Sequence, residues 1–327
     1  MRNRKKWLWV AAVAAAILTG VISWTLTHPA ERSRGVLYRV SGGQGEMYLL
    51  GSIHIGTQDM YPFGTAIRNA MEQADTFVFE CDTASDSAVA QLKARMALPE
   101  GQTLKASVGE PLYEEISQVC EKLSLPLSSL DGLKPWAVIN TLAVYSTAAE
   151  LGSTNVNTAL SLGVEQQVQA YGQKAGKPFA YLETAMEQTD ILEGFSDDLK
   201  RYLLKSECDT ILNPSAVTGM DASISLWPGW WRQGNAAAFS DQYLQSYLEP
   251  GYETVCREYH TKLITNRNEA MTARLSKMLQ EDGTFFVTVG LLHLVLPQDG
   301  IVARLQALGY TVEQIPMETG TTGEANP

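Results

Sequence analysis

Two short apolar runs, far apart in the chain, each lead into a Gly-x-x-His motif. One run precedes Gly51 and His54, and the other precedes Gly290 and His293. Apolar runs of this length bounded by glycine are typical of strands buried on both faces of a parallel sheet. Because ligands bind at the carboxyl ends of such strands, we expect both histidines in an active site. The alternative is that both are core histidines hydrogen-bonded to the backbone.

Two further strand-like runs end in a carboxylate. Residues 76–79 are followed by Glu80, and residues 179–182 are followed by Glu183. Glu80 could instead be a solvated loop acid, and Glu183 could cap the helix that follows. Strands alternate with helical patterns along the chain, and residues 35–40 and 46–52 read as a hairpin. The pattern predicts an α/β fold, with a mixed, largely parallel sheet flanked by helices and an N-terminal hairpin.

Helical periodicity predicts further elements with less bearing on function. Helices are expected at residues 64–73, 87–97, 111–123, 135–150, 164–175, 252–280 and 298–308, and a last strand at 311–315. Residues 206–231 read as an irregular segment rich in tryptophan, which could form a substrate wall or pack over a domain edge. Arg267 falls in the middle of the helix at 252–280, where an arginine is normally a surface residue.

The N-terminus has the residue pattern of a membrane anchor or signal peptide. Four of the first six residues are basic, and residues 7–26, from Trp7 to Leu26, contain no charge. Twenty apolar residues can span a bilayer, with the positive flank on the cytoplasmic side. We therefore expect residues 1–30 to form a membrane anchor, residues 35–316 one extracytoplasmic α/β domain, and residues 317–327 a disordered tail. A signal peptide cleaved to release a secreted protein is the alternative.

Composition excludes several classes of function. The formal net charge is −11, although the N-terminal segment is basic, so the domain does not suit nucleic-acid binding. The chain lacks a P-loop, a Gly-x-Ser-x-Gly elbow and a His-Glu-x-x-His helix, which disfavours a nucleotide enzyme and two common hydrolase types. Four cysteines, Cys81, Cys120, Cys208 and Cys256, could form two disulfides or remain as buried thiols.

The residues that end the four runs have a common chemistry. His54, Glu80, Glu183 and His293 offer the imidazole and carboxylate ligands that hold Zn²⁺, Mn²⁺ or Co²⁺ with positions open for water. A metal held in this way activates water and polarises a carbonyl, which is what amide or ester hydrolysis requires. The alternative is metal-free chemistry, in which one histidine acts as a general base beside a carboxylate.

At these positions the chain resembles the TraB/PrgY/GumN family. The resemblance rests on both Gly-x-x-His motifs, the Phe79-Glu80-Cys81-Asp82 turn, Leu182-Glu183-Thr184 and the segment from Asn266 to Met271. The family includes Tiki-type metalloproteases and proteins that limit peptide pheromones, and it is similar to erythromycin esterases, which implies an EreA/ChaN-like architecture. Ser52 stands where the family more often has threonine, so a hydroxyl is kept.

The resemblance implies roles for individual residues. His54 and His293 would bind the metal, Glu80 would complete the ligand set or act as base, and Arg267 would stabilise an oxyanion or a substrate carboxylate. Glu183, Asn268 and Ser52 would support the ligands or contact the substrate, a peptide or protein. The implied function is a membrane-anchored metallopeptidase. Its rivals are a protein that sequesters peptides without cutting them and a metal- or haem-binding module.

Overall fold

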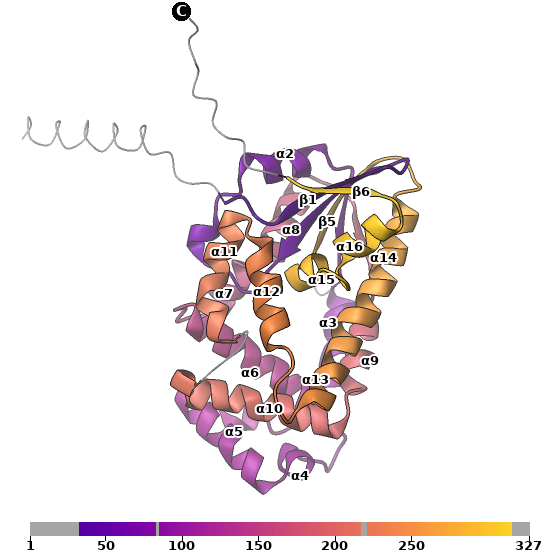
Figure 1. Ribbon diagram of the computed structural model, residues 1–327. Coiled ribbons are helices and arrows are strands. Elements are labelled where there is room, and N and C mark those ends of the chain that lie inside the picture. Colours follow the sequence, from indigo (N-terminus) through magenta and orange to yellow (C-terminus); the bar gives the residue numbers. More distant parts are fainter. Residues whose placement is uncertain (1–32, 83–84, 217–220, 316–327) are drawn as a thin grey trace, which may run out of the picture.

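The computed structural model describes residues 33–82, 85–216 and 221–315. A six-stranded sheet in the order β4-β3-β5-β2-β1-β6 forms its centre (Figure 1). Pairings among β4, β3, β5 and β2 are parallel, and β1 is antiparallel to both of its neighbours. The predicted fold is therefore confirmed. The strands are β1 (Leu37–Ser41), β2 (Glu46–Ser52), β3 (Thr76–Phe79), β4 (Phe179–Tyr181), β5 (Thr284–Gly290) and β6 (Thr311–Gln314).

The register between β2 and β5 places the two Gly-x-x-His motifs side by side. The strands pair in parallel from Glu46 opposite Thr284 to Ser52 opposite Gly290. Both strands carry apolar side chains on both faces, and Leu49, Leu50 and Phe286 are completely buried. Burial of each such side chain contributes about 1.5–3 kcal/mol, so a slip of this register would be costly. The two motifs therefore leave the sheet at the same edge.

Helices cover the sheet and form a second body beyond its carboxyl edge. In Figure 1 the sheet lies at the top, α4, α5, α6 and α10 lie at the bottom, and α14 runs along one side. The α-helices are α2 (Thr65–Gln73), α3 (Asp86–Met96), α4 (Leu104–Val108), α5 (Glu110–Leu123), α6 (Pro135–Glu150), α7 (Val156–Ser161), α8 (Val164–Lys174), α9 (Ala185–Glu193), α10 (Asp197–Leu212), α11 (Trp227–Gln233), α12 (Ala236–Ser246), α13 (Glu253–His260), α14 (Asn266–Met278), α15 (Leu291–Val295) and α16 (Ile301–Ala307).

The lower helices have an apolar core of their own. Except for Leu130, the buried side chains of this cluster come from α4, α5, α6 and α10, and they include Leu104, Ile116, Leu142 and Leu204. A separate and larger cluster fills the two faces of the sheet. The site described below lies at the carboxyl ends of the strands, which is where an α/β fold commonly binds ligands.

Two helical predictions need correction. The helix expected at 252–280 is divided into α13 and α14 by a π-helical turn, Thr261–Thr265. The irregular segment expected at 206–231 is wrong at both ends, because α10 continues through Leu212 and α11 begins at Trp227, with a proline in its first turn. Between these helices the described residues form only short 3-10 turns. Trp231 is fully buried, and its indole N–H donates to the Gly51 carbonyl at 2.7 Å. This tryptophan therefore packs against the sheet and forms no substrate wall.

The expected anchor at residues 7–26 and the expected tail at 317–327 lie outside the described residues. Within residues 33–315, apart from the short gaps, no helix is long and apolar enough to cross a bilayer. Cys81, Cys120, Cys208 and Cys256 are all buried free thiols, so the second of the two expectations for the cysteines holds.

Candidate functional site

Arg267 lies at the centre of a buried polar cluster. Its Nη2 donates to Glu80 Oε2 at 2.6 Å and to Glu183 Oε2 at 2.7 Å, and its Nε donates to both Glu183 oxygens at 3.1 Å. Its Nη1 lies 3.0 Å from His293 Nε2. Only 9% of Arg267 is exposed, so it is not the surface residue that an arginine in the middle of a helix normally is. Three other predicted site residues therefore meet around the guanidinium group of Arg267.

Three parallel strands deliver the partners of Arg267. Glu80 follows β3, Glu183 follows β4, and His293 lies on α15 directly after β5. The Glu183 backbone N–H donates to the Glu80 carbonyl at 2.6 Å, which extends the pairing of β3 and β4 beyond their ends. Glu183 does not cap α9, because the side chain of Thr184 accepts from the Glu187 N–H in that role. The side chain of Glu183 is thus free to pair with Arg267.

The glycines of the two motifs allow close approaches at this edge. A Cβ on Gly290 would lie 3.1 Å from Glu80 Oε1, and the Gly290 N–H donates to the same oxygen at 2.5 Å. A Cβ on Gly51 would lie 2.2 Å from a methyl group of Leu291, so α15 could not pack on β2. Both motifs therefore need glycine for packing, independently of their histidines.

The cluster fixes the charges of its members. Burial alone would raise the pKa of Glu80, but His293, which is protonated at the acidic pH where Glu80 titrates, together with Arg267 and the Gly290 N–H, lowers it to about 2. Burial, reinforced by Arg267, lowers the pKa of His293 to about 4. At neutral pH the imidazole is therefore neutral, and Arg267 is the cation that keeps Glu80 ionised. Burial opposes the charge of Arg267 as well, but Glu80 and Glu183 raise its pKa above the ordinary value.

Asn268, fully buried beside Arg267 on α14, orients the imidazole of His293. Its Oδ1 lies 2.6 Å from His293 Nδ1, and its Nδ2 donates to the Asp299 carbonyl at 2.7 Å. An amide oxygen only accepts, so the proton of the neutral ring is on Nδ1 and the lone pair is on Nε2. Metal-binding histidines are commonly held in this way, with the second nitrogen donating to an oxygen.

His54 differs from His293 in its surroundings. Its side chain is 68% exposed, whereas His293 is buried, so the two motifs do not present their histidines in the same manner. The Val164 N–H donates to the Ile53 carbonyl at 3.0 Å, which holds the start of α8 against this loop. Glu165, in the first turn of α8, therefore lies beside His54, with Oε2 3.7 Å from Nδ1.

Glu165 is a site residue that the sequence patterns did not reveal. Burial first, and then the nearby Glu80, raise the pKa of its carboxyl to about 7, although His54 opposes this. The sequence showed only the apolar stripe of this helix, which includes Val164 and Val168 and packs on the core. Gln188 was missed as well, and its Nε2 lies 3.0 Å from Glu183 Oε2 and 3.3 Å from Glu80 Oε2.

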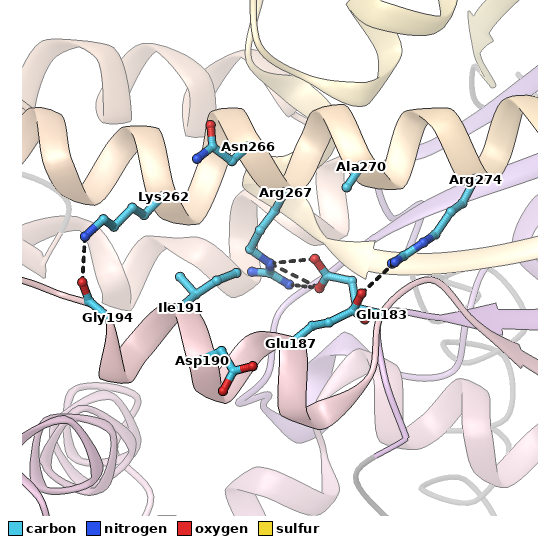
Figure 2. A pocket seen from close by; sticks show the side chains of 10 residues that line it. All are labelled: Glu183, Glu187, Asp190, Ile191, Gly194, Lys262, Asn266, Arg267, Ala270 and Arg274. Carbon is cyan, nitrogen blue, oxygen red and sulfur yellow. Dashed lines mark hydrogen bonds and ion pairs between the residues drawn. The ribbon is translucent and has the colours of Figure 1, made fainter.

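Two hollows flank the cluster. One, of about 420 Å³, is lined by residues that include His54, Glu80, Glu165 and Gln188. The other, of about 450 Å³, is a groove between α9 and α14 (Figure 2). Its cations, Lys262, Arg267 and Arg274, come from the side of α14, and its anions, Glu183, Glu187 and Asp190, come from the side of α9. The ion pairs of Arg267 therefore lie between the two hollows.

Ser52 adds a hydroxyl at the same edge. It is 3% exposed, and its Oγ has no hydrogen-bond partner among the described residues. It pairs in register with Gly290, and side chains at paired positions of parallel strands lie on the same face. Since the Cβ position of Gly290 faces Glu80 and His293, Ser52 lies on the face of the sheet that carries the cluster.

The donor chemistry of these residues fits a divalent metal ion. His293 has its lone pair on Nε2, Glu80 is ionised, and His54 and Glu165 line the same pocket as Glu80. Two buried carboxylates, Glu80 and Glu183, face one guanidinium, which leaves an excess of negative charge. Across the described ranges, however, no three such side chains lie close enough together to hold an ion, and the lone pair of His293 faces Arg267 Nη1.

Comparison with known proteins gives a family but no activity. The TraB/PrgY/gumN family matches residues 36–314. Two curated relatives, both called uncharacterized protein YbaP, come from Escherichia coli strain K12 and Shigella flexneri. Each is 25% identical over 253 residues, which cover 77% of this chain and 85% of the relative. No solved structure matches.

Proposed function

Because the chain belongs to the TraB/PrgY/gumN family, we propose that it is a metal-dependent hydrolase that cleaves amide bonds in peptides or proteins. One observation carries the proposal: the buried cluster of Arg267 with Glu80, Glu183 and His293 lies at the carboxyl edge of three parallel strands, beside the exposed His54. Maintaining one buried cation against two carboxylates is costly, and strand ends are where such a fold binds ligands.

The proposed metal ligands are His54, Glu80 and His293. When bound, a Mn²⁺, Co²⁺ or Zn²⁺ ion would supply a water of lowered pKa and polarise the scissile carbonyl. Asn268 holds the ring of His293 so that Nε2 presents its lone pair. Glu80 suits the role of ligand better than that of base, because its pKa of about 2 makes it a poor proton acceptor at neutral pH.

Glu165 is better suited to move protons than Glu80. Its pKa of about 7 matches the working range of a general acid or base, and it lines the pocket that contains His54. Arg267 keeps a permanent charge and a planar fork, which suits it to stabilise an oxyanion or to orient a substrate carboxylate. In the resting arrangement that fork is held by Glu80 and Glu183, which keep it in place.

The groove between α9 and α14 supports a peptide as substrate. Its two walls carry opposite charges, and Ile191 lies between them (Figure 2). A peptide backbone with charged side chains of both signs could pair with both walls, whereas a nucleic acid would be repelled by the acidic wall. The same groove also supports the second candidate function, in which the protein binds peptides and does not cleave them.

Incubation with a mixed peptide library distinguishes the two functions. The purified full chain, in detergent, is tested after chelation and again after addition of Mn²⁺, Co²⁺ or Zn²⁺, with cleavage followed by mass spectrometry. Metal-dependent new termini that are absent in Glu80→Gln support the hydrolase. Peptides that are retained intact with every ion support the sequestering protein. Cleavage that continues in the presence of the chelator would instead support metal-free acid/base chemistry.

We also propose that the domain is extracytoplasmic and held by an anchor at residues 7–26. The proposal rests on the uncharged run behind four basic residues, since these residues lie outside the part that the structure describes. Protease added to intact cells, or to spheroplasts where an outer membrane is present, should digest the domain. Protection until lysis would contradict the topology, and recovery of the domain in the medium would support the signal-peptide alternative.

A further inference from the structure

We infer that His260 and Asp299, which lie outside the pocket, are positioning residues that keep the proton of His293 on Nδ1 and the lone pair on Nε2. This inference deepens the proposed function, because it concerns how one proposed ligand is made ready for an ion. It adds a role for a third histidine of the chain, to which the sequence patterns assigned none.

A single backbone carbonyl decides the orientation of the Asn268 amide. Asn268 Nδ2 can only donate, and the Asp299 carbonyl, 2.7 Å away, can only accept. The amide is therefore fixed with Oδ1 toward His293, and Oδ1 can only accept from Nδ1. An amide turned the other way would place N–H against Nδ1 and move the ring proton to Nε2. The Asp299 carbonyl, acting through Asn268, thus favours the proton on Nδ1. Arg267 Nη1, which can only donate and lies 3.0 Å from Nε2, favours the same tautomer from the other side of the ring.

Asp299 is held on both sides. Its Oδ2 lies 3.1 Å from His260 Nε2, and Arg304 donates to its Oδ1 and to its backbone carbonyl, each at 3.0 Å. His260 is held in turn, because its Nδ1 lies 2.9 Å from the Tyr243 hydroxyl and its ring packs against Tyr247, with centroids 5.0 Å apart. A chain of contacts therefore runs from Tyr243 through His260, Asp299 and Asn268 to His293.

The π-helical turn between α13 and α14 explains how one helical segment reaches Asp299 twice. Two turns of α-helix span about seven residues, but His260 and Asn268 are eight apart. The π turn, Thr261–Thr265, takes up the extra residue, so both side chains come to the same side of the segment. His260 then contacts the carboxylate of Asp299, and Asn268 contacts its carbonyl. Such turns often occur at functional sites.

Nitrogen-15 NMR of the histidine side chains tests the inference directly. The chain has four histidines, so the spectrum of the full chain labelled at histidine can be assigned by substitution. In chelator-treated protein at neutral pH, His293 should show the proton on Nδ1. In Asn268→Ala, and to a smaller extent in His260→Phe, the population should shift toward the proton on Nε2. His260→Phe keeps an aromatic ring against Tyr247 but loses both hydrogen bonds.

Two further variants distinguish a positioning role of His260 from a general disturbance of the structure. His260→Gln can still donate to Asp299 and should restore much of the Nδ1 form, and Tyr243→Phe leaves the contact of His260 with Asp299 intact and should change little. Zn²⁺ affinity, measured by competition with a chromophoric chelator, should fall about tenfold in His260→Phe. A wild-type His293 with its proton on Nε2, or the same tautomer population in Asn268→Ala and His260→Phe, would overturn the inference.

The two readouts distinguish failure of the inference from failure of the proposed function. In one outcome the Nδ1 form is found to depend on Asn268 and His260 while no ion binds and no peptide is cut. That result would support the positioning role and contradict the proposed hydrolase. If ions bind and peptides are cut while neither substitution changes the tautomer of His293, the proposed hydrolase is supported and the positioning role is contradicted.

Discussion

Arg267 Nη1 lies 3.0 Å from His293 Nε2, so a permanent cation faces the lone pair of a neutral imidazole. The contact is possible because burial and Arg267 together lower the pKa of His293 to about 4. In the proposed reaction this lone pair is the one that an ion would share. The contact therefore connects the structural role of Arg267 with its functional role, and the two can be separated by substitution.

Replacement of Arg267 should show both roles. Arg267→Met leaves Glu80 and Glu183 buried without a cation, and we expect it to lower the free energy of unfolding by about 3–5 kcal/mol. Arg267→Lys keeps the charge but loses the planar fork, so it should remain folded and lose most of its turnover. Urea denaturation and peptide cleavage measure the two effects.

Arg274→Lys is the matched control for Arg267. It lies on the same helix, and its side chain is 40% exposed in an ion pair with Glu187. Its unfolding free energy should change by no more than about 0.5 kcal/mol. Wild-type activity in Arg267→Lys would contradict the proposed role, and unchanged stability in Arg267→Met would contradict the buried cluster itself.

Alanine variants of His54 and His293 should differ in stability, and both should lack activity. His54→Ala removes an exposed side chain, so the free energy of unfolding should change by less than about 0.5 kcal/mol. His293→Ala leaves Asn268 Oδ1 buried without its donor, which should cost about 1–3 kcal/mol. Both variants should abolish cleavage. Cleavage by the His54→Ala variant would show that His54 is not part of the site, which would then consist of the cluster around Arg267.

The free energy of unfolding should decrease as the pH is lowered, because His293 is protonated more readily in the unfolded chain. In metal-free protein its pKa is about 4 when folded, below the ordinary 6.5, so the unfolded chain takes up this proton at higher pH than the folded chain does. The free energy of unfolding should therefore decrease as the pH drops from about 6.5 to about 4, by roughly 2–3 kcal/mol from this group. His293→Gln should have a flatter profile over that window. Identical slopes in the two proteins would show that the imidazole is not buried in its neutral form.

The sequence predicted the sheet well because its signals were local. The strand β2 and the helix α6 were predicted with the bounds that the structure has, since glycine and proline mark their ends. The segment 206–231 was misread because proline and tryptophan, typical of loops, here lie in a helix start and a core contact. The division of the helix expected at 252–280 by the π turn could not be predicted from the periodicity of its apolar residues.

Prediction of the site succeeded for residues that end strands and failed for residues that reach it from helices. Glu80 and His293 follow buried strands, so their meeting could be inferred from the order of elements. Glu165 and Gln188 lie on α8 and α9, and only the packing of those helices brings them to the pocket. The different exposure of His54 and His293 also depends on packing, because His293 lies on α15, which begins directly after Gly290 and packs against β2.

Titration with Co²⁺ tests most directly whether the two motifs form one site. Visible absorption reports ligand binding to this ion, and wild type should bind one Co²⁺ per chain. His54→Ala, Glu80→Gln and His293→Ala should each lose that band, and the double variant of both histidines should be no worse than either single one, because a site missing one ligand already fails. Glu110→Gln, an exposed carboxylate on α5, should bind as wild type does. Stoichiometric Co²⁺ retained by both single histidine variants would contradict the account.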